Sequence, residues 1–399
     1  MWKVKPPLVF PMETRYRPIL ESLVPPNPMS QFRLKRGSPE EEFPDLCRNS
    51  TWMGRILTRD MYCRQFDRCT HSGVVFDDVI RPGLEEPGDC SGAVSVGCVA
   101  GDAQSYILFC DFFDRVIEAH HEHKISSQTP ESDFNYNNLK TLCVQGGDDL
   151  DRSYAVRCEV SVVRGVDDFC FPTHCSRGER RQLLTLARRA LQRLEEEELP
   201  GRFLSLEKLD RDQQTELNLI PPSSSQQRIG VARDWPDARA VWISNDGSLV
   251  VWVNMEDHLR LVSTQDDANM VEAFKRICIN LQKLDAYYRE FKHPFIWKQQ
   301  LGWVTSSPAD VGTGLRVSVH LKLQQLPRHK RLQDILKRLR MRLDKTESSA
   351  LYLVSNTATF GLSEVELTQL VVDGVKLLIA MEKRLEVDRD IDELVPTQK

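Results

Sequence analysis

Residues 252–262, WVNMEDHLRLV, bring an acid, an imidazole and a guanidinium into one short stretch of the chain. Interpreted as a β-strand, the stretch has two faces, because successive side chains of a strand point to opposite sides. One face would carry Trp252, Asn254, Glu256, His258 and Arg260, and the other Val253, Met255, Asp257, Leu259 and Leu261. The pattern therefore predicts the floor of a charged site on one face of a sheet.

Three other segments have the patterns of strands that could extend this sheet. Residues 238–254, ARAVWISNDGSLVVWVN, predict a hairpin that turns at Asp246-Gly247. Residues 154–163, YAVRCEVSVV, and 315–323, LRVSVHLKL, alternate between apolar and polar positions. Their common polar face would collect Arg157, Glu159, Glu256, His258, Arg260, Arg316 and His320.

Helical patterns separate these strands. Residues 103–123, 176–199, 271–291 and 363–385 have the apolar spacing of helices. Two of these segments open with a capping box, formed by Ser176 with Glu179 and by Ser363 with Glu366. Strands of this kind with helices packed on one face predict an α+β fold.

Changes in composition along the chain suggest its domain organisation. We expect a flexible, proline-rich N-terminal arm over 1–40 and a small, mainly helical domain over 41–125. A polar segment over 126–152 would be the linker. A larger domain with an antiparallel sheet flanked by helices would occupy 153–399.

Bulk composition excludes several classes of protein. The 399 residues are 41% hydrophobic and 28% charged with a net charge of −5, which is typical of a globular protein and does not favour nucleic-acid binding. No apolar run approaches the roughly 20 residues that a transmembrane helix needs. The eleven cysteines show no CxxC pair, so we expect reduced thiols in the cytoplasm and no protein-bound metal. A mitochondrial presequence is the disfavoured alternative, because frequent prolines would break its helix.

From the residues alone, the polar face has two interpretations. A strand with one polar face is usually only solvated on that side. Several arginines crossing a sheet can instead clamp a phosphate chain through paired hydrogen bonds. The sequence has no P-loop and no GxGxxG motif to supply backbone amides.

Six segments carry a resemblance to a known family. They are 172–181 (PTHCSRGERR), 231–242 (VARDWPDARAVW), 249–263 (LVVWVNMEDHLRLVS), 292–304 (KHPFIWKQQLGWV), 312–323 (GTGLRVSVHLKL) and 362–383 (LSEVELTQLVVDGVKLLIAMEK). Together they resemble the phosphagen (guanidino) kinases, most of all creatine kinase. The final residues 391–399, IDELVPTQK, resemble the ending of the cytosolic forms.

The resemblance implies a fold, a reaction and an assembly. It implies a helical N-terminal domain, a larger domain with a helix-flanked antiparallel sheet, and a homodimer in which Trp235 lies at the interface. Its reaction moves the γ-phosphoryl group of Mg-ATP to a guanidino substrate. Glu256 would contact the guanidinium and act as its base, while Arg260, Arg316 and His320 would belong to the nucleotide site. Asn254, Asp257 and His258 also match the family pattern.

Several positions depart from the family. His120, Glu159, Ser161 and Thr359 stand where arginines are expected, Met255 replaces a glutamate, and Ser307 replaces the reactive cysteine. Glu159 would set a like charge against a polyphosphate, which Arg157 on the same face could partly offset. Both loops that shape the substrate pocket also differ, at 88–92 (GDCSG) and 343–353 (LDKTESSALYL). In the second loop, Lys345 would lie near a missing arginine.

These departures predict a creatine kinase-like protein with lost or strongly reduced phosphoryl transfer and a role as a binding or scaffold protein for an unknown partner. One well-placed arginine is worth roughly 10³–10⁵ in the rate of such a reaction. The alternative is an active guanidino kinase with altered nucleotide contacts and a different acceptor. A further alternative is that the basic N-terminal arm docks on a partner or a membrane surface.

Overall fold

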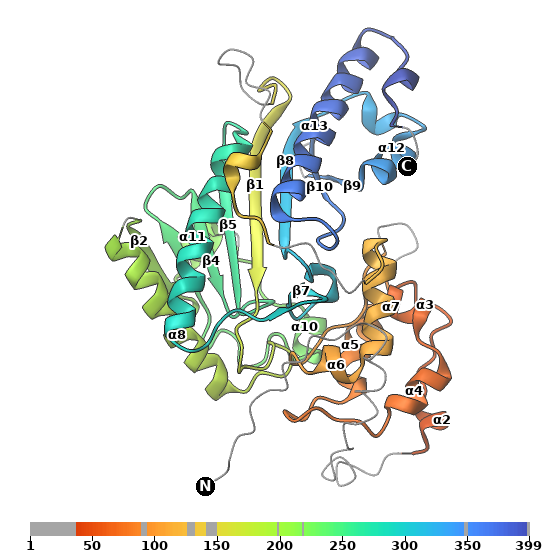
Figure 1. Cartoon of the computed structure of the whole chain (residues 1–399), viewed down its shortest axis with the longest axis vertical. Coiled ribbons are helices and arrows are strands. Elements are labelled where there is room, and N and C mark those ends of the chain that lie inside the picture. The colour runs from red at the N-terminus through yellow and green to blue at the C-terminus, as the bar shows by residue number, and fades with distance from the viewer. Residues whose placement is uncertain are drawn as a thin grey trace.

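The computed structural model describes residues 37–88, 94–125, 132–140, 150–197, 199–217, 219–346 and 350–396. Outside these ranges lie residues 1–36 of the N-terminal arm expected over 1–40, residues 89–92 of the changed loop at 88–92, and most of the expected linker. Figure 1 shows a small helical domain beside a larger domain built on a sheet. The small domain contains α2 (Pro39–Glu42), α3 (Trp52–Ile56), α4 (Arg59–Gln65), α5 (Phe76–Glu85), α6 (Ser105–Leu108) and α7 (Cys110–His121).

The larger domain is organised around an eight-stranded sheet in the order β2-β3-β4-β5-β1-β8-β10-β9, with every neighbouring pair antiparallel. The strands are β1 (Ala155–Arg164), β2 (Gly201–Ser205), β3 (Ala240–Ser244), β4 (Leu249–Val253), β5 (Leu259–Gln265), β8 (Leu315–Lys322), β9 (Met341–Lys345) and β10 (Leu351–Asn356). A separate two-stranded sheet joins β6 (Trp297–Lys298) to β7 (Gly302–Trp303).

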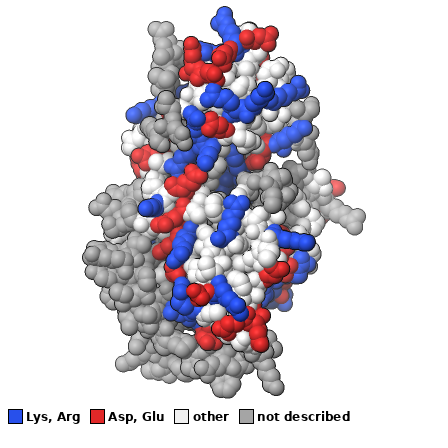
Figure 2. All heavy atoms as spheres, turned by 90° about the vertical axis from the view of Figure 1, so that its right-hand side faces the viewer, with Lys and Arg blue, Asp and Glu red and all other residues white. Residues whose placement is uncertain are grey.

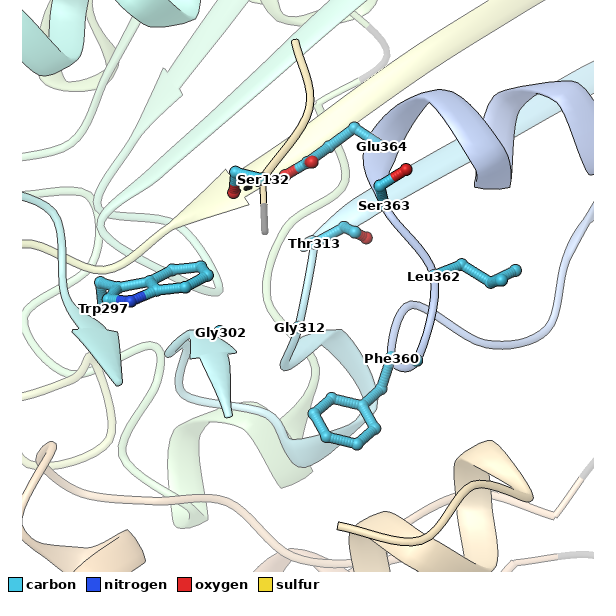
Figure 3. Close-up of a pocket in the computed structure, with 10 residues that line it drawn as sticks. Ser132, Trp297, Gly302, Gly312, Thr313, Phe360, Leu362, Ser363 and Glu364 are labelled. Atoms are coloured by element: carbon cyan, nitrogen blue, oxygen red, sulfur yellow. Dashed lines mark hydrogen bonds between the residues drawn. The ribbon is translucent and has the colours of Figure 1, made fainter. Parts of the chain in front are cut away.

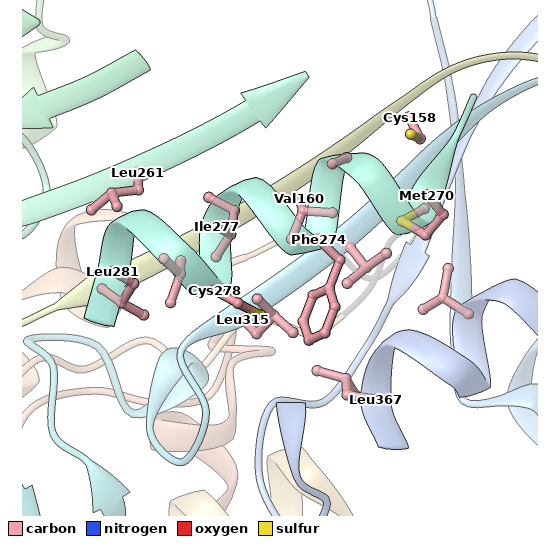
Figure 4. Close-up of a cluster of buried hydrophobic side chains, with 14 of the residues drawn as sticks. Cys158, Val160, Leu261, Met270, Phe274, Ile277, Cys278, Leu281, Leu315 and Leu367 are labelled. Carbon is pink, nitrogen blue, oxygen red and sulfur yellow. The ribbon is translucent and has the colours of Figure 1, made fainter. Parts of the chain in front are cut away.

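Long helices cover one face of the large sheet. They are α8 (Arg177–Glu197), α11 (Met270–Glu290) and α13 (Glu364–Glu386), with the shorter α12 (Leu332–Leu339) beside β9. Figure 4 shows Phe274 and Ile277 of α11 among apolar side chains of the strands, with Leu367 of α13 nearby. Burying one such side chain contributes about 1.5–3 kcal/mol to the free energy of folding. The apolar layer between the sheet and these helices therefore stabilises the larger domain.

Shorter elements connect these layers. They are η3 (Tyr136–Asn138), η4 (Leu206–Lys208), α9 (Arg211–Glu216), α10 (Ser224–Arg228), η5 (Pro308–Asp310), η6 (Leu326–Arg328) and η7 (Asp392–Leu394). Among the described residues, no helix is both long and apolar enough to cross a membrane.

The predicted α+β fold is confirmed, and so are its local signals. Glu366 and Ser363 exchange hydrogen bonds at the start of α13, as the capping-box spacing predicts. The carboxylate of Asp246 accepts bonds from Ser244 and Ser248 and closes the β3–β4 turn.

The opening stretch differs from its predicted form. Residues 252–262 are not one strand, because β4 ends at Val253 and β5 begins at Leu259. Asn254 adopts a left-handed conformation with φ of 58°, and its side-chain amide donates to the carbonyls of Arg180 and Ala238. These bonds hold the chain in a tight reversal, so strict alternation fails between 254 and 258. Trp252 and Arg260 still share a face, because they pair directly across the hairpin.

The two domains share an apolar core. Phe171, Ile296, Val304 and Phe360 of the larger domain pack within the same buried cluster as the small domain's helices. Across this interface the Tyr106 hydroxyl donates to the carbonyl of Thr305 at 3.0 Å. The Nε2 of His121, at the end of α7, donates to the carbonyl of Pro308 at 2.9 Å, so this helix end is held against the loop that precedes β8.

Candidate active site

The candidate site lies on the face of the large sheet that α8, α11 and α13 leave uncovered. We call it the open face. Residues that pair directly on neighbouring strands share a face, so the register identifies its members. They are Arg260 on β5, Arg157, Glu159 and Ser161 on β1, Arg316, Ser318 and His320 on β8, Ser355 on β10, and Arg342 and Asp344 on β9.

Arg316 is the best-defined cation on the open face. Its Nη2 lies 3.3 Å from Oδ1 of Asp310, and its Nη1 donates to the carbonyl of Asn356 at 3.4 Å. Its side chain is 24% exposed, so solvent and small ligands can reach it. Both contacts are long, which leaves most of the guanidinium's hydrogen-bonding capacity for a ligand.

Arg260 brings a second cation to the same face. Its Nε is buried and has no hydrogen-bond partner among the described residues. An unpaired buried donor is costly, and an anion in this position would satisfy it. Arg260 and Arg316 lie on the two strands that flank β1, and both are on the open face.

His120, at the end of α7, reaches this region from the small domain. Burial lowers the pKa of its imidazole to about 4, with Asp310, Arg316 and Arg342 as its charged neighbours. Its Nε2 is buried and has no partner within the described ranges. At neutral pH His120 is therefore an uncharged group beside the cations, without the positive charge of an arginine.

Three of the residues that differ from the family pattern make hydrogen bonds to the protein backbone. The Thr359 hydroxyl donates to the carbonyls of Ala309 and Val311 and is buried. The Ser161 hydroxyl is buried and donates to the carbonyl of Arg316 at 3.5 Å. Ser307 caps η5 by accepting the amide of Ala309 at 3.2 Å.

The end of the open face that is formed by the start of β1 and the end of β8 carries charges of both signs. Glu159 lies opposite Ser318, between the cations and His320. Arg157 pairs with His320 in the register of β1 and β8. Its Nε lies 3.5 Å from Oδ1 of Asp266, and the side chains of Arg157 and Asp266 are both well exposed. Burial, and then the neighbouring Arg157, lower the pKa of His320. Arg260 pairs with Val163 of β1, and Arg157 precedes Val163 by six residues on the same strand. The backbone of Arg157 is therefore about 20 Å from that of Arg260.

The β4–β5 hairpin presents Glu256 at its tip. Glu256 is exposed, and its backbone carbonyl accepts the Ser306 hydroxyl at 3.1 Å. The adjacent Asp257 is buried and accepts the amides of Ser306 at 2.6 Å and of His258 at 2.9 Å. Burial raises the pKa of Asp257 to about 7. The hairpin therefore holds the loop that leads to Asp310.

Other residues named from the sequence have structural partners. The ring nitrogens of His258 bond to the amide of Val166 and the carbonyl of Cys170, so this imidazole is not on the open face. Met255 is partly buried beside the apolar cluster around Leu206 and Val241. The half-buried Trp235 stacks under the guanidinium of Arg239, 5.0 Å from its ring centre.

Strand β9 supplies the cation that sequence reasoning missed. Lys345 is exposed at its end and pairs with Tyr352, whose other neighbour is the buried core residue Leu321. It therefore points away from the open face. Arg342, three positions earlier, lies on the open face and pairs with Ser355. The alternation in residues 341–345 would have revealed it, had this segment been interpreted as a strand.

A pocket near the linker offers little room for a ligand. Figure 3 shows it between Ser132, Trp297 and Glu364. Its volume is about 10 Å³, close to the minimum for one water molecule. Glu364 is buried there and accepts the amide of Asp133 at 2.9 Å. The pocket belongs to the packing of residues 132–140 on the larger domain.

The described residues include no group of three or more His, Cys, Asp or Glu side chains that could hold a metal ion. Figure 2 shows that basic and acidic side chains are interspersed over the side of the molecule that faces the viewer there, rather than forming a patch of one sign.

Known proteins with this sequence pattern and fold are guanidino kinases. The chain matches the models of the ATP:guanido phosphotransferase C-terminal catalytic domain over residues 182–385 and N-terminal domain over 47–118. It is 40% identical to creatine kinase M-type of Rattus norvegicus over 385 residues, covering 94% of this chain and 99% of the relative. Creatine kinase M-type of Gallus gallus is 41% identical over 374 residues, covering 91% and 96%.

Solved structures agree with this assignment. A lombricine kinase superposes with a TM-score of 0.80 at 32% identity, covering 91% of this chain and all of the other. A duplicated taurocyamine kinase from Schistosoma mansoni has a TM-score of 0.77 at 23% identity, covering 89% of this chain and 50% of that one, and shares the fold. The chain belongs to the ATP:guanido phosphotransferase family, as a creatine kinase-like phosphagen kinase.

Proposed function

We propose that this protein is a creatine kinase-like binding protein in which phosphoryl transfer to creatine is lost or strongly reduced. Its open face would still bind the phosphates of ADP or Mg-ATP weakly. A protein partner would then be recruited through the retained fold, which would act as a scaffold.

The observation that carries this proposal is the burial and hydrogen bonding of Ser161 and Thr359. At both positions, where the family has arginines, the side chain is buried and bonded to backbone carbonyls. Neither position can offer a cation to a transferring phosphoryl group. Such transfer depends on positioning and on neutralising the charge of the transition state.

Glu159 supports the same conclusion. It lies on the open face between Ser318 and Thr264, on the strand next to Arg316. A carboxylate here opposes a polyphosphate by repulsion between like charges. The remaining cations, Arg260 and Arg316, are therefore expected to hold a nucleotide weakly and to stabilise the transition state poorly.

A second candidate is an active guanidino kinase with a different acceptor. The exposed Glu256 at the tip of the β4–β5 hairpin favours it, because a carboxylate there remains free to orient a guanidinium. In this case Mg-ATP, with Arg260 and Arg316 on its phosphates, would raise the unfolding temperature, because a ligand of the folded state stabilises it.

A coupled assay of the full chain with Mg-ATP tests both candidates. Creatine, glycocyamine, taurocyamine and arginine serve as acceptors, and Glu256→Gln serves as the matched control. No turnover above that control supports the proposal. Turnover near that of an ordinary creatine kinase contradicts it, and turnover of another guanidine that disappears in Glu256→Gln supports the second candidate.

We further propose a homodimer in the cytoplasm. Trp235 stacks on the buried Arg239 and is itself only half-buried, so part of its ring is available for a subunit contact. Light scattering of the wild type and of Trp235→Ala tests the dimer, which we expect the substitution to weaken. Cell fractionation tests the compartment, and recovery in the mitochondrial matrix would contradict it.

A further inference from the structure

Strand β9 places an arginine on the open face at a position that the family resemblance did not identify. Arg342 pairs with Ser355, and Ser355 pairs with Ser318 of β8. Arg316 is two residues from Ser318 on the same face. Two strand spacings and two residues separate the Cα atoms of Arg342 and Arg316 by about 12 Å, a gap that two arginine side chains can bridge from both sides.

The contacts of Arg342 leave its guanidinium available. Its Nε donates to the Ser355 hydroxyl at 2.9 Å and lies 3.1 Å from a carboxylate oxygen of Asp344. Both contacts use Nε, so the two Nη groups can bind a ligand. The side chain is 39% exposed, which permits access from solvent.

We propose that Arg342 and Arg316 form a two-guanidinium clamp for the diphosphate group of a nucleotide, with Arg342 taking over part of the task of the missing arginines. Planar guanidinium groups bind phosphate oxygens through paired, charge-assisted hydrogen bonds. This inference rests on the proposed function, because it assumes that the open face still binds phosphates.

The electrostatics of the cluster support the clamp. Burial, and then the proximity of Arg316, lower the pKa of Arg342. The neutral His120 adds no charge beside them. Two cations held together in this way repel each other, and a diphosphate placed between them would relieve that repulsion. Asp310 and Asp344 each form an ion pair with one guanidinium, so a diphosphate would compete with these two carboxylates.

Calorimetric titration of the full chain with ADP and with pyrophosphate tests the clamp. We expect Arg342→Gln to weaken the binding of both ligands by about 10-fold or more, because a hydrogen bond to a charged group is lost. Arg115→Gln is the matched control: Arg115 is an exposed arginine of α7 paired with Asp111, and its loss should change neither affinity. Arg342→Lys keeps the charge but not the fork, and should give an intermediate affinity if Arg342→Gln fails to fold.

Three results would overturn the clamp. The first is an Arg342→Gln variant that binds both ligands as the wild type does while Arg316→Gln loses them. The second is a loss confined to ADP, which would place Arg342 on the nucleoside. The third is a wild type that binds neither ligand. The first two results leave the proposed nucleotide binding of the open face intact, whereas the third removes that binding as well, and none of them measures phosphoryl transfer. Failure of the clamp alone is therefore distinguishable from failure of the proposed function.

Discussion

Arg164 of β1 and Arg316 of β8 lie on opposite faces of two neighbouring strands, and each has a carboxylate partner. Arg164 is on the helix-covered face, buried with Glu364 at 3.9 Å and with the ring of Trp303 4.4 Å from its guanidinium. Arg316 is on the open face, with Asp310 at 3.3 Å and a side chain that is 24% exposed. An arginine–carboxylate pair is thus part of the packing on one face and accessible to ligands on the other.

This difference separates what the fold needs from what the chemistry needs. The covered face keeps a continuous apolar core around α11. The open face carries Glu159 and Ser161 where the family resemblance leads one to expect arginines, and it carries Arg342 on β9. Changes on the open face cost little stability, because exposed charge pairs contribute about 0–1 kcal/mol. A family fold can therefore persist while its ligand chemistry changes.

The largest effect is expected when the buried pair is broken. Arg164→Ala should lower the free energy of unfolding by about 3–5 kcal/mol, because it leaves Glu364 buried without a cation. Burial lowers the pKa of Arg164 to about 10, so the guanidinium is charged in the native state at neutral pH. Urea denaturation measures the loss.

The double variant Arg164→Met with Glu364→Gln provides the control for this comparison. It removes both charges, so most of the loss should be recovered. An Arg164→Ala variant as stable as the wild type would show that burial does not distinguish the two pairs.

A pH-dependent effect is expected where the small domain meets the open face. Burial holds the pKa of His120 near 4 in the folded state, below the 6.5 of an unfolded chain. Protons then bind the unfolded state preferentially between these two values, so stability falls as the pH drops from about 6.5 to about 4. His120→Gln should remove about 1.4 kcal/mol per pH unit from that slope.

Denaturation curves of the wild type and of His120→Gln at pH 7, 6, 5 and 4 measure this slope. Parallel curves for the two proteins would show that His120 is charged or solvated in the native state. His71→Gln, at an exposed histidine of the small domain, is the matched control for the loss of one imidazole.

The smallest effect is expected at the exposed pair of Arg157 and Asp266. Arg157→Ala should change the unfolding free energy by less than about 0.5 kcal/mol, because both side chains are well exposed. Thermal and urea unfolding check this value. A loss comparable with that of Arg164→Ala would contradict the contrast between the two faces, and a fall in ADP affinity would extend the ligand site along β1 to Arg157.

Much of the fold could be predicted from local patterns. The capping boxes at Ser176 and Ser363, the turn at Asp246-Gly247 and the alternation of β8 each involve residues close in sequence, and all of them are present. The prediction failed at 252–262, because the left-handed conformation of Asn254 depends on acceptors at Arg180 and Ala238 that are distant in the chain.

By itself, the sequence determined the α+β class and the family, because these follow from periodicity and from motifs read along one chain. Only the tertiary structure decided which charged groups share the open face. Strand pairing brings Arg342 of β9 onto the same face as Arg316 of β8 and turns Lys345 away, while burial assigns Thr359 and His258 to the packing. Register and burial are set by contacts between distant segments, which a linear pattern does not contain.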